Sequence, residues 1–264
     1  LDWNPNVDAG NAVYSIALSS GSDTDDAPGL ADSSDTPPVL YVGGDFTHLA
    51  GAARSDIAAL TTDDTGTLVS WDANADNADG PVYRLALSPD QTVLYVGGRF
   101  TGIGGQQARA ALAALTASDG KATAWDPEPS GGDSTRFDPA VSGAGPWIGA
   151  LTASSTGRLY AGGNYSLMGG QAQFLFSAFQ APTSTATPPG GPYPSARSVI
   201  LACTDKDGND CSNNVLYSTD GSTPSTPYAS GAQIPLNTTG TLKYFAVDSE
   251  GMRENINTDS YIID

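Results

Sequence analysis

The sequence predicts an all-β protein, and three observations support this fold class. Gly and Pro are frequent, with 31 and 18 of the 264 residues, whereas Glu occurs at only three positions. No segment spaces Glu, Lys, Leu and Ala at the 3.6-residue period of a long helix. Short runs rich in Val, Ile, Tyr and Thr are separated by Gly, Asp and Asn, which is typical of strands joined by turns.

One phrase occurs three times in the first two thirds of the chain. It reads VLYVGGDFTHLAG at 39–51, VLYVGGRFTGIGG at 93–105 and RLYAGGNYSLMGG at 158–170. Self-similarity of this kind indicates a repeat architecture in which each copy is one structural unit. A predicted strand precedes each copy, at 12–19, 81–88 and 146–153, and an apolar run follows each copy, at 56–61, 111–117 and 174–180.

A fourth strand that ends in Trp follows the first two apolar runs. Four short antiparallel strands in roughly 45–55 residues are typical of one blade of a β-propeller. We therefore expect about three four-stranded blades, with the phrase as the inner strand of each blade. Propellers have roughly four to eight blades. We accordingly expect a fragment of a longer propeller or, as the second alternative, a propeller completed by neighbouring copies.

The recurrent residues of the repeat are predicted to be structural. The Gly pair permits a close backbone approach or a bulge, and the Trp provides a large apolar anchor. Asp72 and Asp126 each follow such a Trp, which favours a role in a turn. The residues assigned to the repeat are Tyr41, Gly43, Gly44, Tyr95, Gly97, Gly98, Tyr160, Gly162, Gly163, Trp3, Trp71 and Trp125.

A second domain is predicted after the repeats. Residues 1–180 carry the repeats, a segment rich in Pro, Thr, Ser and Gly at 181–190 is predicted as a linker, and 191–264 form the second domain. Short strand-like runs in that part favour a small Ig-like β-sandwich. Cys203 and Cys211 bracket a polar loop, which suits a disulfide in an oxidising compartment; the alternative is two free thiols in a cytosolic protein.

The repeat resembles a known family. The stretch LYVGGRFTGIGGQQARAALAALTASDGKATAWDP resembles the delta-60-type repeats of secreted and cell-surface bacterial β-propellers. The first repeat keeps an arginine at Arg54, and in the third Phe174 falls where the second has Arg109. The resemblance implies a propeller fold and a bacterial, extracellular setting, but no reaction, because propellers host many functions.

The C-terminal part resembles another family. The phrases LYSTDGSTP at 216–224 and KYFAVDSEG at 243–251 are similar to those of the chitobiase/hexosaminidase C-terminal type of Ig-like domain. This resemblance implies an accessory, non-catalytic module. It also implies that Cys203 and Cys211 staple one loop.

The charge of the chain excludes some partners. Asp and Glu number 29 against 11 Lys and Arg, so the formal net charge is -18. Phosphate backbones and anionic lipid surfaces repel such a chain, and we expect no nucleic-acid partner. No run approaches 18 consecutive apolar residues, so we expect no membrane span in this chain.

Catalytic residues are not predicted. The single His, His48, occupies a position at which the second repeat has Gly102. One His cannot form a triad without a placed nucleophile, and it cannot form a His-ligated metal site. Paired carboxylates could hydrolyse glycosidic bonds, but no acid recurs in the repeats with a distinctive apolar setting that would raise its pKa. We therefore expect that the chain is not an enzyme.

Calcium is the one cofactor that the sequence suggests. Residues 205–210 read DKDGND and offer the oxygen ligands of Asp205, Asp207, Asn209 and Asp210 around a Gly turn. The segment departs from an EF-hand loop because its Gly comes early and no Glu follows at the twelfth position. The alternative is a polar turn held by the disulfide.

These features together predict a non-catalytic, secreted or cell-surface protein. Its predicted role is a structural or adhesive component of an extracellular assembly, with self-association or other surface proteins as partners. The alternative is an accessory or carbohydrate-binding region of a polysaccharide-degrading enzyme whose catalytic domain lies elsewhere. Such a region would bind polysaccharide through exposed aromatic residues such as Tyr83, Trp147 or Tyr193.

Overall fold

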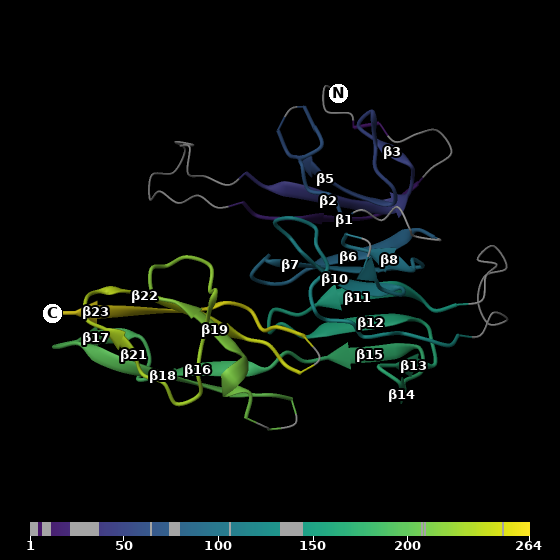
Figure 1. Cartoon of the computed structure of the whole chain (residues 1–264). Helices are drawn as coiled ribbons and strands as arrows, with labels where there is room; N and C mark the ends of the chain where they lie inside the picture. Colours follow the sequence, from purple (N-terminus) through teal and green to yellow (C-terminus); the bar gives the residue numbers. More distant parts are fainter. Residues whose placement is uncertain are drawn as a thin grey trace. The chain divides into compact units, whose positions relative to one another are not determined.

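The protein is all-β and divides into two compact units (Figure 1). The computed structural model describes residues 5–6, 12–21, 37–63, 65–73, 80–105, 107–132, 145–206, 208, 210–249 and 251–264. The first unit comprises Leu1–Ser155 with Leu159–Ala178, and the second comprises Thr156–Arg158 with Phe179–Asp264. Each unit has its own buried apolar core.

The first unit contains three antiparallel sheets of three strands, which we name the first, second and third repeat sheets. Each sheet has the same order, with the second of its strands in the middle. The strands of the three sheets are β1 (Ala12–Leu18), β2 (Val39–Asp45) and β5 (Ile57–Thr61); β6 (Val82–Leu87), β7 (Val93–Gly98) and β10 (Leu112–Thr116); and β11 (Trp147–Ala153), β12 (Leu159–Asn164) and β15 (Phe176–Phe179).

The repeated phrase forms the central strand of each sheet and not the inner one that we expected. β2, β7 and β12 each pair on both edges, with the strand before and the strand after them. The predicted fourth strand is reduced to single bridges, Leu60 with Leu68 and Leu115 with Ala122. The described residues form no closed propeller.

Each phrase also forms a short hairpin that the sequence did not predict. In the first copy the turn residues Ala50 and Gly51 have φ of 50° and 77°. A two-residue hairpin turn of type I′ requires two successive left-handed residues, which explains the Gly there. The hairpin strands are β3 (His48–Leu49) and β4 (Ala52–Ala53), β8 (Gly102–Ile103) and β9 (Gln107–Ala108), and β13 (Leu167–Met168) and β14 (Gln171–Ala172).

The second Gly of each pair lies against the backbone of the first strand of its own sheet. A Cβ on Gly44 would lie 2.1 Å from the carbonyl oxygen of Ala12, and a Cβ on Gly163 would lie 2.0 Å from that of Trp147. Gly98 is in the same position. The pairing register shifts at this point in all three sheets, so each first strand carries a β-bulge.

The first Gly of each pair receives a side chain from the next sheet. A Cβ on Gly43 would lie 2.6 Å from Cγ1 of Val82, and a Cβ on Gly97 would lie 2.7 Å from Cγ2 of Ile148. The first strands β1, β6 and β11 accordingly lie side by side in chain order (Figure 1). The main core of the first unit lies between its first two sheets.

The Tyr and Trp of the repeat pack on each other. Tyr41 meets Trp71 edge-to-face with ring centroids 5.2 Å apart, and Tyr95 meets Trp125 in the same way at 5.8 Å. All four rings are buried. In the third sheet Tyr160 instead stacks on a phenylalanine, Phe176, at 6.2 Å. Trp3 lies outside the described residues.

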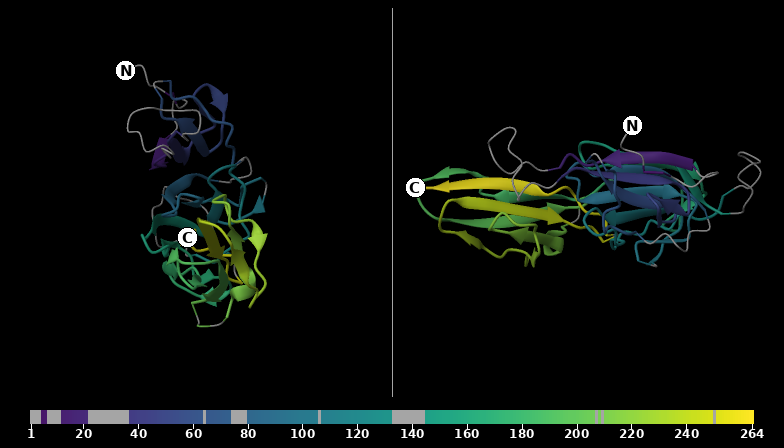
Figure 2. Two further views of the ribbon diagram at one scale, coloured as in Figure 1. Left: turned by 90° about the vertical axis from the view of Figure 1, so that its left-hand side faces the viewer. Right: turned by 90° about the horizontal axis from the view of Figure 1, so that it is seen from above.

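The second unit is a sandwich of two sheets around a shared core, with its strands running lengthwise beside one another (Figure 2). The segment 181–190, predicted as a linker, contains strand β16, because its alternating residues bury Ser184 and Ala186. The elements are β16 (Thr183–Thr187), β18 (Arg197–Thr204) and β21 (Ile234–Leu236) in one sheet; β17 (Gly191–Tyr193), β23 (Asn257–Ile263), β22 (Gly240–Ala246), β19 (Val215–Ser218) and β20 (Thr226–Pro227) in the other; and the 3-10 helix η1 (Ser212–Asn214).

Candidate functional site

Three aromatic side chains form a row across the first strands of the repeat sheets. The ring centroids of Tyr14 on β1 and Tyr83 on β6 are 5.7 Å apart, with an interplanar angle of 58°. The rings of Tyr83 and Trp147 on β11 are 6.4 Å apart and nearly perpendicular, at 87°. Tilted and edge-to-face contacts at these distances are the favourable geometry for aromatic pairs. We name these three residues the aromatic row.

The β-bulges explain how the aromatic row arises. Tyr14 and Tyr83 are the extra residues at which the register shifts in β1 and β6. A bulge re-aims the side chain of its extra residue. In β11 the corresponding residue is Gly149, and a Cβ there would lie 2.5 Å from Cζ3 of Trp147. The Trp147 ring therefore covers the place of the missing side chain in the third sheet.

The aromatic row combines accessible rings with polar groups. Tyr14 is 44% exposed, and Tyr83 and Trp147 are half-buried. Burial raises the pKa of Tyr83; the positive charge of Arg99 acts in the opposite direction, and the negative charge of Asp45 adds to the rise. The Tyr83 hydroxyl is thus neutral at pH 7 and feels the charges of one basic and one acidic side chain. This arrangement can pack against an apolar face and exchange hydrogen bonds at its rim.

The recurrent acids after Trp are held in ion pairs. Arg109 Nη1 lies 3.0 Å from Asp126 Oδ2, and Arg109 Nη2 donates to the Thr123 carbonyl oxygen at 3.0 Å. Arg54 and Asp72 form the corresponding pair in the first repeat at 3.7 Å. These pairs join the end of each short hairpin to the segment that carries the Trp.

The third repeat has Gln173, and not Phe174, at the position of the arginine. The backbone N–H of Gln173 donates to the Ser166 carbonyl, as that of Arg109 does to Thr101. The two repeats differ in spacing because the hairpin of the second repeat has a loop longer by one residue. The prediction that Phe174 occupies the position of the arginine is therefore wrong by one residue.

The other predicted site residues are not brought into a catalytic or metal arrangement among the described residues. His48 is exposed on β3, with Nδ1 3.2 Å from Thr47 Oγ1. No group of three or more His, Cys, Asp or Glu side chains that could hold a metal occurs in the described part of the chain.

The predicted calcium segment is only partly described. Asp207 and Asn209 lie outside the described residues. Asp210 Oδ1 accepts hydrogen bonds from the backbone N–H of Ser212 at 2.8 Å and from its hydroxyl at 2.5 Å. The bonds from Ser212 lower the pKa of Asp210. Asp205 begins the same turn, where its carbonyl accepts from the N–H of Gly208.

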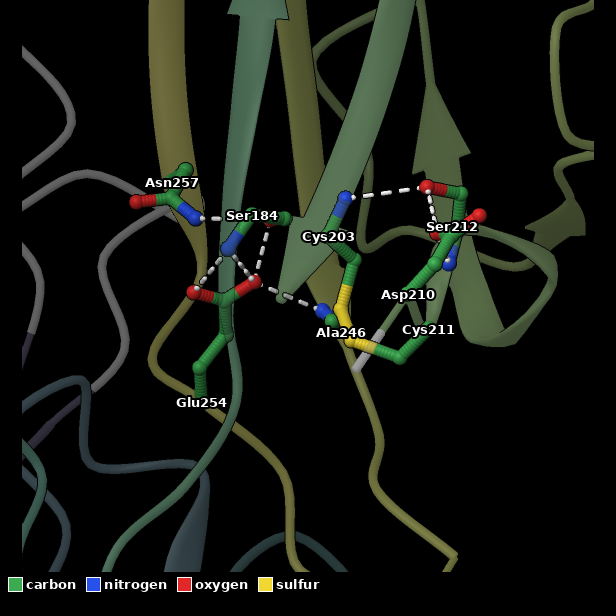
Figure 3. The surroundings of a disulfide bond; sticks show 8 residues. All are labelled: Ser184, Cys203, Asp210, Cys211, Ser212, Ala246, Glu254 and Asn257. Atoms are coloured by element: carbon green, nitrogen blue, oxygen red, sulfur yellow. Dashed lines mark hydrogen bonds between the residues drawn. A yellow bond between two sulfur atoms is a disulfide. The ribbon is translucent and has the colours of Figure 1, made fainter. Parts of the chain in front are cut away.

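Cys203 and Cys211 form a disulfide, as predicted (Figure 3). Both are buried in the core of the second unit, with their Cα atoms 4.9 Å apart. The N–H of Cys203 donates to the Ser212 hydroxyl at 3.0 Å, so the loop is also closed by a hydrogen bond. The disulfide fixes the connection between β18 and η1 on the surface of the sandwich.

Glu254 links the two sheets of the second unit (Figure 3). Its carboxylate accepts the backbone N–H of Ser184 on β16, at 3.0 and 3.1 Å, and also the Ser184 hydroxyl. The same carboxylate accepts the N–H of Ala246 on β22 at 2.8 Å. Asn257 Nδ2 donates to the Ser184 hydroxyl at 3.2 Å and completes this group.

Tyr193, a predicted sugar contact, is engaged inside the second unit. The Arg197 guanidinium lies 4.6 Å from the centroid of its ring, and the ring stacks on Tyr261 at 6.1 Å. Sequence reasoning missed Tyr14 and Glu254. Tyr14 could have been found by aligning VYSIALS with VYRLALS, whereas no local pattern marks Glu254, because its partners are distant in sequence.

By its fold and site, the chain is an all-β protein with one unit of repeated sheets and one β-sandwich unit. Residues 188–258 match the family model of the chitobiase/beta-hexosaminidase C-terminal domain, which agrees with the resemblance of the second unit. No curated protein and no solved structure matched the chain. Within the part of the chain that the structure describes, no helix has the length and apolarity needed to cross a membrane.

Proposed function

We propose that this chain is a non-catalytic, extracellular polysaccharide-binding protein. In this proposal the three repeat sheets are blades of a β-propeller, and the aromatic row is the surface that contacts the sugar. The second unit is an accessory module of the kind found beside carbohydrate-active domains. The chain thus provides the polysaccharide-binding function of a larger enzyme or surface assembly.

The aromatic row is the observation that carries the proposal. Sugar rings present C–H faces that pack against aromatic rings, and their hydroxyls exchange hydrogen bonds with polar groups at the rim. Three neighbouring rings, with the charges of Asp45 and Arg99 acting on the Tyr83 hydroxyl, offer both kinds of contact. A row that crosses three sheets suits an extended chain of sugar units better than a small ligand.

Two further features support the setting and the absence of catalysis. The match at 188–258 to a domain of carbohydrate-active proteins and the Cys203–Cys211 disulfide both fit an extracellular location. The recurrent acids Asp72 and Asp126 are engaged with arginines, and this favours a structural role for them over acid–base chemistry. Calcium binding at 205–210 stays a prediction.

Affinity electrophoresis in gels that contain a polysaccharide tests the proposal. Chitin derivatives and other soluble polysaccharides are the probes. We expect at least one of them to retard the chain. The retardation should be at least several-fold smaller for Trp147→Ala and for Tyr83→Ala. Phe174→Ala removes an exposed aromatic ring outside the row and should stay retarded. Equal retardation of all three variants would exclude the row as the binding surface.

A structural or adhesive role is the second candidate function. The observation that favours it is the presence of exposed apolar side chains at both ends of the set of repeat sheets, on β1 and on β15. Self-association without sugar would support this role, and the two roles are compatible in one extracellular assembly.

A further inference from the structure

The outer surfaces of the first and third repeat sheets expose side chains that are buried elsewhere in the repeat. We define the leading face as Val13, Ile16 and Leu18 on β1. We define the trailing face as Tyr160 and Gly162 on β12 with Phe176 on β15. Both faces belong to the first unit.

The pairing registers show which residues are equivalent. Val13, Val82 and Ile148 all lie opposite the second Gly of their sheet. Val82 and Ile148 are 0% exposed, whereas Val13 is 44% exposed. Ile16 is equivalent to Leu85 by the same registers, and the two are 63% and 7% exposed. The leading face thus lacks the covering sheet that its equivalents have.

The trailing face lacks a covering sheet in the same way. Phe176 is equivalent to Ile57, because each follows a residue with positive φ at the start of the last strand of its sheet. Phe176 is 59% exposed and Ile57 is 1% exposed. A Cβ on Gly162 would meet nothing closer than 3.5 Å, whereas its equivalent Gly43 is covered by Val82. The space over Gly162 is therefore unfilled, and Val13 is an exposed side chain equivalent to the Val82 side chain that fills the space over Gly43.

We propose that the leading face of one copy of the chain packs on the trailing face of a second copy. The contact repeats the interface that already joins the first sheet to the second and the second to the third, with Val13 seated over Gly162 of the second copy. Two copies of three sheets make six, which lies within the roughly four to eight blades of closed propellers. A head-to-tail contact that closes on itself gives a discrete dimer, not a filament. The occupant of both faces is a second copy of this chain.

The oligomeric state of the full chain tests this inference. Light scattering after gel filtration should give twice the mass of one chain at micromolar concentration, without added sugar. Ile16→Asp and Phe176→Lys should each raise the dissociation constant of the dimer on the order of a hundredfold, because each buries an unpaired charge. Ile262→Asp is the matched control, since Ile262 is also exposed but lies on β23 of the second unit, and it should remain dimeric.

Mixing the two variants distinguishes head-to-tail pairing from a contact of like faces. A mixed pair has one unaltered interface and one in which Asp meets Lys, so the mixture of Ile16→Asp and Phe176→Lys should form dimers again. If two leading faces met instead, Phe176→Lys would not weaken the dimer and would not restore dimer formation to Ile16→Asp. This result would overturn the proposal. A monomeric parent chain would overturn it as well.

A covalent trap gives an independent readout. The double variant Val13→Cys with Gly162→Cys should form a disulfide-linked dimer under mild oxidation, whereas Val13→Cys alone should not form the same linkage. A double variant that stays uncrosslinked would contradict the inference. Both readouts are separate from the sugar-binding assay, so either proposal can fail without the other.

Discussion

At the scale of single residues, Asp56 is the carboxylate with the least favourable environment among the described groups. It is buried, its φ is 62°, and its Oδ1 accepts the N–H of Phe46 at 3.2 Å. Burial raises the pKa of Asp56 to about 6, the bond from Phe46 opposes this rise, and the nearby Asp45 adds to it. The charge of Asp56 therefore opposes folding at neutral pH.

We predict that Asp56→Asn stabilises the first unit at pH 7.5 and not at pH 4. The folded pKa of about 6 exceeds the ordinary 3.8, so the native state holds the proton more tightly and its stability falls as pH rises between these values. Removing this effect should add roughly 1 to 3 kcal/mol to the free energy of unfolding at pH 7.5. Asn keeps the acceptor oxygen and tolerates positive φ.

Urea unfolding followed by Trp emission measures this effect, because all four Trp residues precede the second unit's main segment. Asp63→Asn is the control: hydrogen bonds, chiefly from Thr65, lower the pKa of Asp63 to about 2, so neutralising it should not stabilise the protein at pH 7.5. An equal gain from both substitutions would show that the effect comes from net charge alone.

Glu254 gives a second prediction at this scale. Glu254→Gln replaces one accepting oxygen by a donor that faces the N–H groups of Ser184 and Ala246. We expect the free energy of unfolding of the second unit to fall by about 1 to 3 kcal/mol. Scanning calorimetry should show a lower Tm for that unit. Glu128→Gln, an exposed change in the first unit, should leave this transition in place.

At the scale of elements, the ion pairs of the first two repeats differ in distance and in burial. The side chains of Arg109 and Asp126 are 13% and 27% exposed at 3.0 Å, whereas those of Arg54 and Asp72 are 23% and 46% exposed at 3.7 Å. The better-buried and shorter pair should contribute more to stability, because solvent screens it less.

We predict that Arg109→Gln destabilises the first unit by about 1 to 3 kcal/mol and that Arg54→Gln costs less than about 1 kcal/mol. Gln is the natural residue at the equivalent position, Gln173, so the hairpin can form without the arginine. Urea unfolding of the two variants, again followed by Trp emission, compares the losses directly. Equal losses of stability in the two variants would contradict the prediction that the better-buried ion pair contributes more.

Sequence reasoning predicted the elements with strong local patterns and missed those without them. Three strands per repeat follow from apolar runs beside turn residues. The short hairpins have strands of only two residues, too short for any period to be visible. The Trp segment looked like a fourth strand, but it pairs through a single bridge residue in each repeat. Strand β16 was not predicted, because the Pro- and Gly-rich residues that follow it made the segment resemble a linker.

The candidate site was predictable only in part for a similar reason. Tyr83 and Trp147 were identified as exposed aromatic residues, but their alignment with Tyr14 depends on the β-bulges and on sheet-to-sheet packing. A register shift has no signature in composition. The equivalence of Gln173 with Arg109 was likewise obscured by one additional loop residue, which only hydrogen bonding reveals.

At the scale of the whole molecule, one sheet-to-sheet interface is used repeatedly within the first unit. A branched side chain of one sheet fills the space over the first Gly of the preceding sheet, at Val82 over Gly43 and at Ile148 over Gly97. The same packing brings the first strands together and so creates the aromatic row. The architecture and the proposed binding surface therefore have a common origin in the repeated phrase.

The measurement that most directly tests the polysaccharide-binding account is the Trp emission of the full chain during titration with a soluble oligosaccharide of the retarding polysaccharide. Trp71 and Trp125 are buried, while Trp147 is half-buried in the row. We predict a saturable shift of the emission to shorter wavelength, which Trp147→Phe abolishes. Binding without any change in emission, or a shift that persists in Trp147→Phe, would contradict the account.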